Sequence, residues 1–155
     1  MKTLILGIGN PILRDDGIGP RLVRELQGFI PNPDITLRET SLAGINLMEL
    51  LTGFDRAIII DAIRTGGKAG EVYWLTPDDF GVSDEDFYSQ HGVGILQALY
   101  LGRDLAQPMP QEVAIVAIEA EDVHNFGEGL TAEVEKTVPV VKKQILAKLN
   151  KWQNY

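Results

Sequence analysis

The sequence predicts an α/β fold, in which helices cover both faces of a mostly parallel sheet and residues 1–155 form a single domain. Two observations lead to this prediction. Short apolar runs alternate along the chain with longer segments of helical spacing, the order typical of βαβ units. The runs 57–60 and 113–118 contain no polar residue, and such continuous apolar strands are typical of a sheet buried on both faces. With 155 residues, 45% of them apolar, the chain can build one core.

Each element follows from its own pattern. Apolar or alternating runs predict strands at 3–6, 35–39, 57–60, 72–75 and 113–118. The fourth of these is expected as a hairpin return or an edge strand, because it follows a Gly-Gly turn. Helical spacing predicts helices over 18–29, 45–51, 92–101 and 132–149. Thr131 is the expected N-cap of the last helix, and Pro139 inside it should either kink or split it.

Composition limits the function. Twenty-two acidic residues against 14 basic ones give a net charge of −8, which argues against binding to nucleic acid or to an anionic membrane. The longest apolar run, 113–118, is far shorter than the ~18 residues of a membrane span, and the chain enters its first strand directly, without the pattern of a signal peptide. A cytoplasmic location is therefore expected. Cysteine is absent, which excludes disulfides, thiolate metal sites and a cysteine nucleophile.

Acidic residues follow two of the predicted strands. Asp15 and Asp16 lie in the loop after strand 3–6, and Asp61 comes directly after strand 57–60. Because ligands bind parallel sheets at the carboxyl ends of the strands, these loops should meet at one edge. We expect one of the two adjacent aspartates to cap the helix that begins near Ile18, and the other to serve as an oxygen ligand or a general base. Asp61 either caps the next turn or joins this site.

The glycine-rich segment 7–19 does not fit the dinucleotide-binding pattern G-x-G-x-x-G, because Ile12 stands where the third glycine is needed. The acidic pair before the helix would also repel a pyrophosphate. Nucleotide binding remains only as an alternative. A serine nucleophile in the G-x-S-x-G pattern and a zinc-binding H-E-x-x-H helix are both missing from the sequence.

The only histidines are His91 and His124. Alone, His91 is more typical of a helix cap or a surface residue than of a ligand. Combined with Asp16 and Asp61, it completes a set of two carboxylates and one imidazole that suits nickel or zinc and leaves coordination positions open. His124 is expected at the surface or behind the residues that contact a ligand.

Four motifs in this order resemble the hydrogenase maturation endopeptidase family, which includes the hydrogenase 2 and 3 maturation proteases. They are Gly7-x-Gly9-Asn10-x-x-x-x-Asp15-Asp16-Gly17-x-Gly19, Ile60-Asp61-Ala62, Ser89-x-His91 and Gly127-Glu128-Gly129-Leu130-Thr131-x-Glu133-Val134. The resemblance implies a three-layer α/β/α protein with a twisted, mostly parallel five-stranded sheet, of which one edge strand can be antiparallel. It also implies that Asp16, Asp61 and His91 are the metal-contacting and catalytic residues.

The implied activity is that of a cytoplasmic, aspartic-type endopeptidase that removes the C-terminal extension from the large-subunit precursor of a [NiFe] hydrogenase. The nickel is supplied by the substrate and is recognised there, no organic cofactor takes part, and zinc or cadmium can replace nickel in crystals. The expected protein is a monomer whose partner is this precursor, with neither nucleic acid nor membrane involved. The alternative is a nickel-sensing binding module or checkpoint chaperone without peptidase activity of its own.

Overall fold

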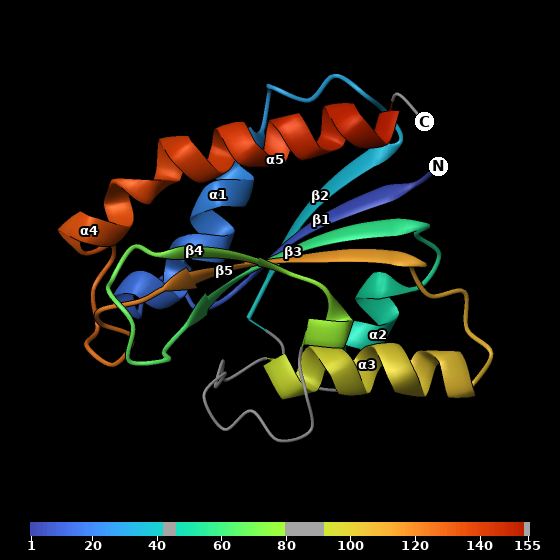
Figure 1. The fold of residues 1–155 in the computed structure, drawn as a ribbon, viewed down its shortest axis with the longest axis horizontal. Coiled ribbons are helices and arrows are strands. Elements are labelled where there is room, and N and C mark those ends of the chain that lie inside the picture. The colour runs from blue at the N-terminus through green and yellow to red at the C-terminus, as the bar shows by residue number, and fades with distance from the viewer. Residues whose placement is uncertain (42–45, 80–91, 154–155) are drawn as a thin grey trace.

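The computed structural model describes residues 1–41, 46–79 and 92–153, which form a five-stranded sheet between two layers of helices (Figure 1). The strands are β1 (Thr3–Ile8), β2 (Ile35–Thr40), β3 (Arg56–Ile63), β4 (Val72–Leu75) and β5 (Glu112–Glu119). The helices are α1 (Ile18–Leu26), α2 (Asn46–Leu51), α3 (Gly92–Asp104), α4 (Ala132–Glu135) and α5 (Thr137–Gln153), with 3-10 turns η1 (Arg14–Gly17) and η2 (Pro77–Asp79).

The strand order is β2-β1-β3-β5-β4, and every neighbouring pair is parallel except β4 with β5. The predicted fold class is therefore confirmed, including an antiparallel strand at one edge. None of the helices in the described ranges is long and apolar enough to cross a membrane.

Alternate residues of the central strands pack against opposite helical layers, as the period of two in a strand requires. On β3, Ile58 and Ile60 face α1 and α5, whereas Ala57 and Ile59 face α2 and α3. All four side chains are fully buried. This burial on both sides explains why the strand residues 57–60, between Arg56 and Asp61, are all apolar.

Two predicted helices differ in their limits. The first ends at Leu26, and Phe29, expected on its apolar face, is 61% exposed. The last is split into α4 and α5, so that Pro139 becomes the third residue of α5. In the first turn of a helix the backbone N–H has no intrahelical acceptor, and a proline there sacrifices no hydrogen bond. Of the two outcomes expected at Pro139, the structure has the split.

Candidate functional site

The loop after β1 is held against the sheet by a close approach of backbones. At Gly19, in the first turn of α1, a Cβ atom would lie 2.6 Å from the Ile60 carbonyl oxygen and 2.7 Å from that of Ile8. Only glycine lets the start of the helix sit this near the ends of both strands. The preceding turn η1, which carries Asp15 and Asp16, also contacts β3.

Asp16 is 6% exposed and is oriented by the backbone of its own loop. Its Oδ2 accepts a hydrogen bond of 2.7 Å from the Asn10 N–H, while the Asn10 Oδ1 accepts one of 3.1 Å from the Ile12 N–H. Gly9 adopts a φ of 150°, and a Cβ there would lie 1.8 Å from the Asp16 carbonyl oxygen. The loop thus fixes the Asp16 carboxylate at the edge of the sheet.

Asp15 has a different role from its neighbour. It is fully buried, and its carboxylate accepts hydrogen bonds from the N–H groups of Glu121 and Asp122, at 2.9 and 3.0 Å, and from both the N–H and the hydroxyl of Thr131, at 2.8 Å. Such a carboxylate fastens the first loop to residues 121–131. We therefore assign the Asp15 carboxylate a structural role.

The prediction that one of these aspartates caps the helix near Ile18 is wrong. The N-cap of α1 is Gly17, and no side chain bonds to the helix there. Thr131 does occupy the N-cap of α4, as predicted, but it makes no capping hydrogen bond because its hydroxyl donates to Asp15. The long-range contact between Asp15 and Thr131 thus takes up both of these side chains in place of local capping.

Asp61 is 1% exposed and lies inside β3, two residues before its end. The prediction that it ends the strand is therefore wrong, because pairing with β5 continues through Ile63 opposite Glu119. Pairing with β1 stops at Ile60 opposite Gly7, so Asp61 lies just beyond this last pair. By strand alternation its side chain faces the same side as Ile59, towards the layer of α2 and α3.

The structure brings Asp16 and Asp61 to the same edge of the sheet, as predicted. Helix α3 begins at this edge too, because it runs antiparallel to β5, the strand it precedes (Figure 1). The expected third residue, His91, lies outside the described residues. Within the described residues, no three His, Cys, Asp or Glu side chains form a group that could hold a metal ion. The expected set of three is therefore still a prediction.

Residues 120–131 form the other loop at this edge. Asp122 accepts hydrogen bonds from the backbone N–H and side-chain amide of Asn125 and from the backbone N–H of His124, at 2.8–3.0 Å. These donors lower the pKa of Asp122 to about 2. The side chain of His124 is exposed, which agrees with the prediction of a surface residue.

Sequence reasoning missed Glu119, a buried carboxylate that is the last residue of the central strand β5. Glu119 is 1% exposed, and it accepts hydrogen bonds from the Thr65 N–H, the Thr65 hydroxyl and the Gly67 N–H. It thereby fixes the loop between β3 and β4. The signal was present, since Glu119 directly follows the apolar run 113–118 as Asp61 follows 57–60.

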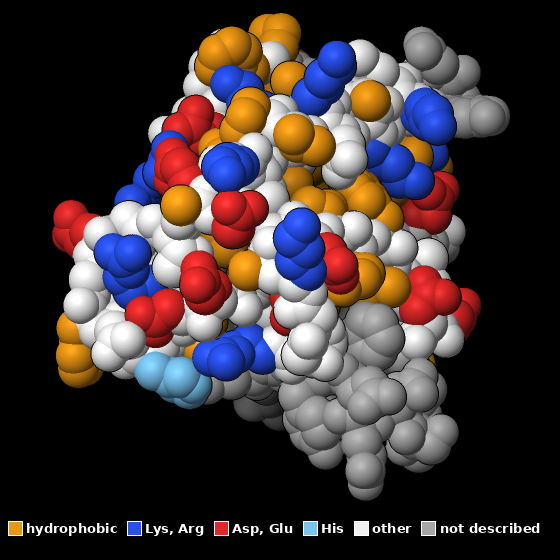
Figure 2. All heavy atoms as spheres, turned by 60° about the vertical axis from the view of Figure 1, so that its left-hand side comes forward, with side chains coloured by type: hydrophobic (Ala, Val, Ile, Leu, Met, Phe, Trp, Pro, Cys, Tyr) orange, Lys and Arg blue, Asp and Glu red, His pale blue; other side chains and the backbone are white. Residues whose placement is uncertain are grey.

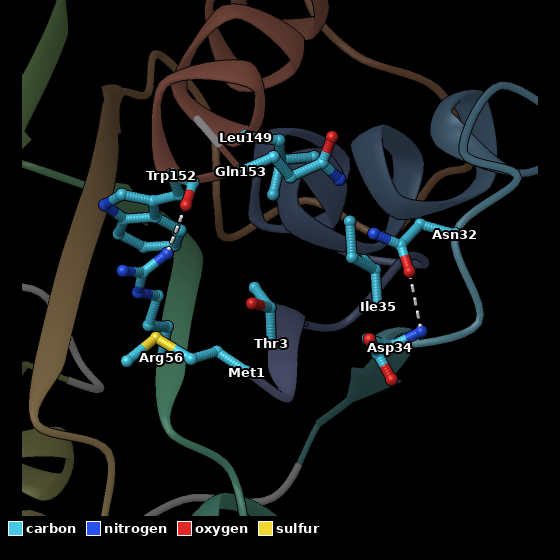
Figure 3. Close-up of a pocket in the computed structure, with 9 residues that line it drawn as sticks. All are labelled: Met1, Thr3, Asn32, Asp34, Ile35, Arg56, Leu149, Trp152 and Gln153. Carbon is cyan, nitrogen blue, oxygen red and sulfur yellow. Dashed lines mark hydrogen bonds between the residues drawn. The ribbon is translucent and has the colours of Figure 1, made fainter. Parts of the chain in front are cut away.

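A cavity of about 370 Å³ lies at the opposite edge, where β1 and β3 begin (Figure 3). Arg56 lies beside it, buried to 8% exposure, and donates a hydrogen bond of 2.7 Å to the Trp152 carbonyl oxygen. Its guanidinium carbon lies 5.4 Å from the centre of the Trp152 ring, and its Nε is 3.8 Å from Glu112. These contacts tie the end of α5 to the sheet and account for the buried arginine structurally.

The sequence matches are to proteins of hydrogenase maturation or formation. A sequence model described as hydrogenase maturation protease matches residues 20–148. The hydrogenase 2 maturation protease of Escherichia coli (strain K12) is 29% identical over 151 residues, which cover 96% of this chain and 91% of that protein. The hydrogenase expression/formation protein HupD of Rhizobium leguminosarum bv. viciae is 25% identical over 153 residues, covering 97% and 75%.

Solved structures agree with the sequence matches. The hydrogenase maturating endopeptidase HybD from E. coli superposes with a TM-score of 0.78 at 28% identity, covering 97% of this chain and 93% of that one. The [NiFe] hydrogenase maturation protease HybD from Thermococcus kodakarensis gives a TM-score of 0.69 at 25% identity, covering 96% and 99%.

Proposed function

The chain belongs to the hydrogenase maturation protease family, and from this premise we propose that it removes the C-terminal extension of a nickel-loaded [NiFe] hydrogenase large-subunit precursor. The nickel is bound to the substrate, and the enzyme recognises this nickel before it cleaves the peptide bond. One observation carries the proposal: Asp16 and Asp61, from segments far apart in the sequence, are both buried at the edge where the family resemblance expects the site.

Electrostatics supports a cation at this edge. Buried carboxylates that approach one another repel, and a divalent ion bound between them would offset both that repulsion and the cost of burial. Carboxylate oxygens are common ligands of divalent ions. The Asn10 N–H donates to one Asp16 oxygen, Oδ2, and so fixes the orientation of the carboxylate that we propose as a ligand.

We further propose that His91 is the third contact to the substrate's nickel. It directly precedes Gly92, the first residue of α3, and α3 covers the face of the sheet towards which Asp61 points. An imidazole beside two carboxylates gives a ligand set of mixed hardness suited to nickel. The substrate's nickel, held by these three residues, would place the adjoining peptide in the site and convert the search for one bond into an intramolecular placement.

For hydrolysis, one of the two aspartates takes a proton from a water molecule as the water oxygen attacks the scissile carbonyl carbon. The C–N bond then breaks, and the leaving amine receives a proton, so that one water is consumed for each peptide bond cut. A carboxylate in this role fits an aspartic-type enzyme. Either Asp16 or Asp61 can act as the base.

The direct test incubates the purified protein with nickel-loaded and with nickel-free large-subunit precursor and follows the precursor's mass. We expect loss of the C-terminal extension only from the nickel-loaded precursor. Equal cleavage of both forms would contradict nickel recognition. Nickel-dependent binding without cleavage would instead establish the alternative function, a nickel-sensing module.

A further inference from the structure

Two large apolar side chains protrude from the loops beside Asp16. Phe126 is 83% exposed and Ile12 is 46% exposed. They are next to one another across a backbone contact, because the Gly127 N–H donates a hydrogen bond of 2.8 Å to the Ile12 carbonyl oxygen and Leu13 forms a parallel bridge with Gly127. We call these two side chains the apolar rim pair.

The backbone that presents this pair is fixed. The Arg14 N–H donates to the Gly127 carbonyl oxygen at 3.1 Å, and Asp15 bonds to Thr131 farther along the same loop. On the other side, Asp122 holds the two residues that precede Phe126. A preorganised loop thus holds the Phe126 side chain exposed to solvent. This lowers the conformational entropy that is lost when a partner covers the side chain. Burial of a phenylalanine side chain is favourable, and the free protein does not gain this stabilisation at Phe126.

The loop that carries Phe126 has three acidic side chains, and the basic side chain of Arg14 packs against Gly127 beside them. Glu121 and Glu128 are exposed, and Asp122, with its lowered pKa, remains charged at neutral pH. Figure 2 brings this edge of the molecule forward and shows acidic side chains, in red, interspersed with basic ones, in blue. The three acidic side chains of this loop outnumber the one basic side chain beside it, which favours a partner with an apolar hollow bordered by basic side chains.

We propose that the apolar rim pair is a docking surface for the folded body of the large-subunit precursor, with Phe126 inserted into an apolar hollow bordered by basic residues. This inference rests on the proposed function. Ile12 and Asp16 belong to one fixed loop, so a precursor docked on the rim pair has its terminal segment within reach of the site. Large aromatic side chains at the centre of an interface often dominate its binding energy.

The test measures binding and cleavage of nickel-loaded precursor by the wild type and by Phe126→Ser. We expect the dissociation constant and KM to rise about tenfold, equivalent to ~1.4 kcal/mol, while kcat is unchanged. Docking acts equally on the ground state and the transition state, which is why KM changes alone. The matched control is Phe29→Ser. Phe29 is 61% exposed in the turn after α1, with Lys142 over its ring, and this variant should bind precursor normally.

The outcomes separate this inference from the proposed function. If Phe126→Ser binds and cleaves like the wild type, the docking surface is wrong and the protease remains. If the wild type binds but does not cleave, while Phe126→Ser binds weakly, the docking surface stands and the protease is wrong. A wild type that dimerises in sedimentation through Phe126 would instead make the pair a self-association surface and overturn the inference. Failure of the wild type to bind precursor would overturn it as well.

Discussion

Asp15 accepts both the backbone N–H and the hydroxyl of Thr131, 116 residues later in the chain, with both distances at 2.8 Å. This pair joins the loop that bears Asp16 to the loop that bears Phe126. A buried carboxylate with several donors is stable in its charged form, because the hydrogen bonds replace those that water would supply. The contact therefore fixes these two loops relative to one another at the carboxyl edge.

Loss of the Asp15 carboxylate should destabilise the fold. Asp15→Asn places an amide NH₂ against N–H donors, and we expect the free energy of unfolding to fall by about 3 kcal/mol. Thr131→Val removes only the hydroxyl and should cost about 1–2 kcal/mol. Because the two residues share a contact, the double variant should cost less than the sum of the single variants. Urea denaturation measures all three. The exposed Asp104→Asn is the control, and an equal effect there would refute the assignment.

Substitution of Asp16 or Asp61, unlike that of Asp15, should reduce activity and leave the stability of the fold nearly unchanged. Asp16→Asn and Asp61→Asn keep the size of the side chain, and the amide introduced by Asp16→Asn would retain an oxygen for the Asn10 N–H, so we expect unfolding free energies within about 1 kcal/mol of the wild type. Cleavage of nickel-loaded precursor should fall by roughly 100-fold or more in each, because each variant loses the charge that we propose to contact nickel or to accept the proton.

His91→Ala tests the third proposed contact in the same assay and should also abolish cleavage. His124→Ala is its control, since His124 is exposed, and it should cleave normally. A loss of activity that is equal in His124→Ala, or that is accompanied by lower melting temperatures in all variants, would show that these residues support the fold and do not form a site.

The sequence was sufficient for the fold because its strong signals are local. Continuous apolar runs at 57–60 and 113–118 indicate strands covered on both faces, and the alternating order of elements indicates parallel pairing. The ends of strands and helices that depend on neighbouring elements were not predicted correctly. Strand β3 extends to Ile63 only because β5 continues beside it, and α5 begins at Thr137 so that Pro139 falls in a first turn.

The site was predictable only in part, for a physical reason. Asp15 and Asp16 are equivalent in a local pattern, and what distinguishes them is Thr131, which becomes a neighbour only on folding. Asp61 and Glu119 are likewise similar in sequence context, yet Glu119 is taken up by the turn at Thr65 and Gly67. Positions in the sequence identify which carboxylates lie at the carboxyl edge of the sheet. Long-range hydrogen bonds, which the sequence does not reveal, determine which of them have structural roles and which are left to bind a ligand.

Asp122 should titrate at an unusually low pH. Its pKa is lowered from 3.8 to about 2 by donors from Asn125 and His124, so its stabilising effect is complete above pH 3.8 and is lost as the pH falls through about 2. In an NMR titration the carboxyl carbon of Asp122 should therefore show a midpoint near 2, and the amide signals of both donors should move with it. Asp122→Asn should remove this transition. A midpoint near 3.8 would mean that the loop presenting Phe126 is not held as described.

Gly9→Ala should be far more harmful than an alanine at another glycine with positive φ. At Gly9 a Cβ would lie 1.8 Å from the Asp16 carbonyl oxygen, a backbone atom that can move only if η1 moves with it. We expect a loss of about 3 kcal/mol or more in unfolding free energy, and in any folded fraction a displaced Asp16 with lower cleavage activity. Gly28→Ala is the matched control, because Gly28 has a φ of 83° and nothing within 4 Å of the added Cβ. It should lose only ~1–2 kcal/mol from backbone strain and retain activity. Similar unfolding curves for the two variants would contradict the close contact between Gly9 and Asp16.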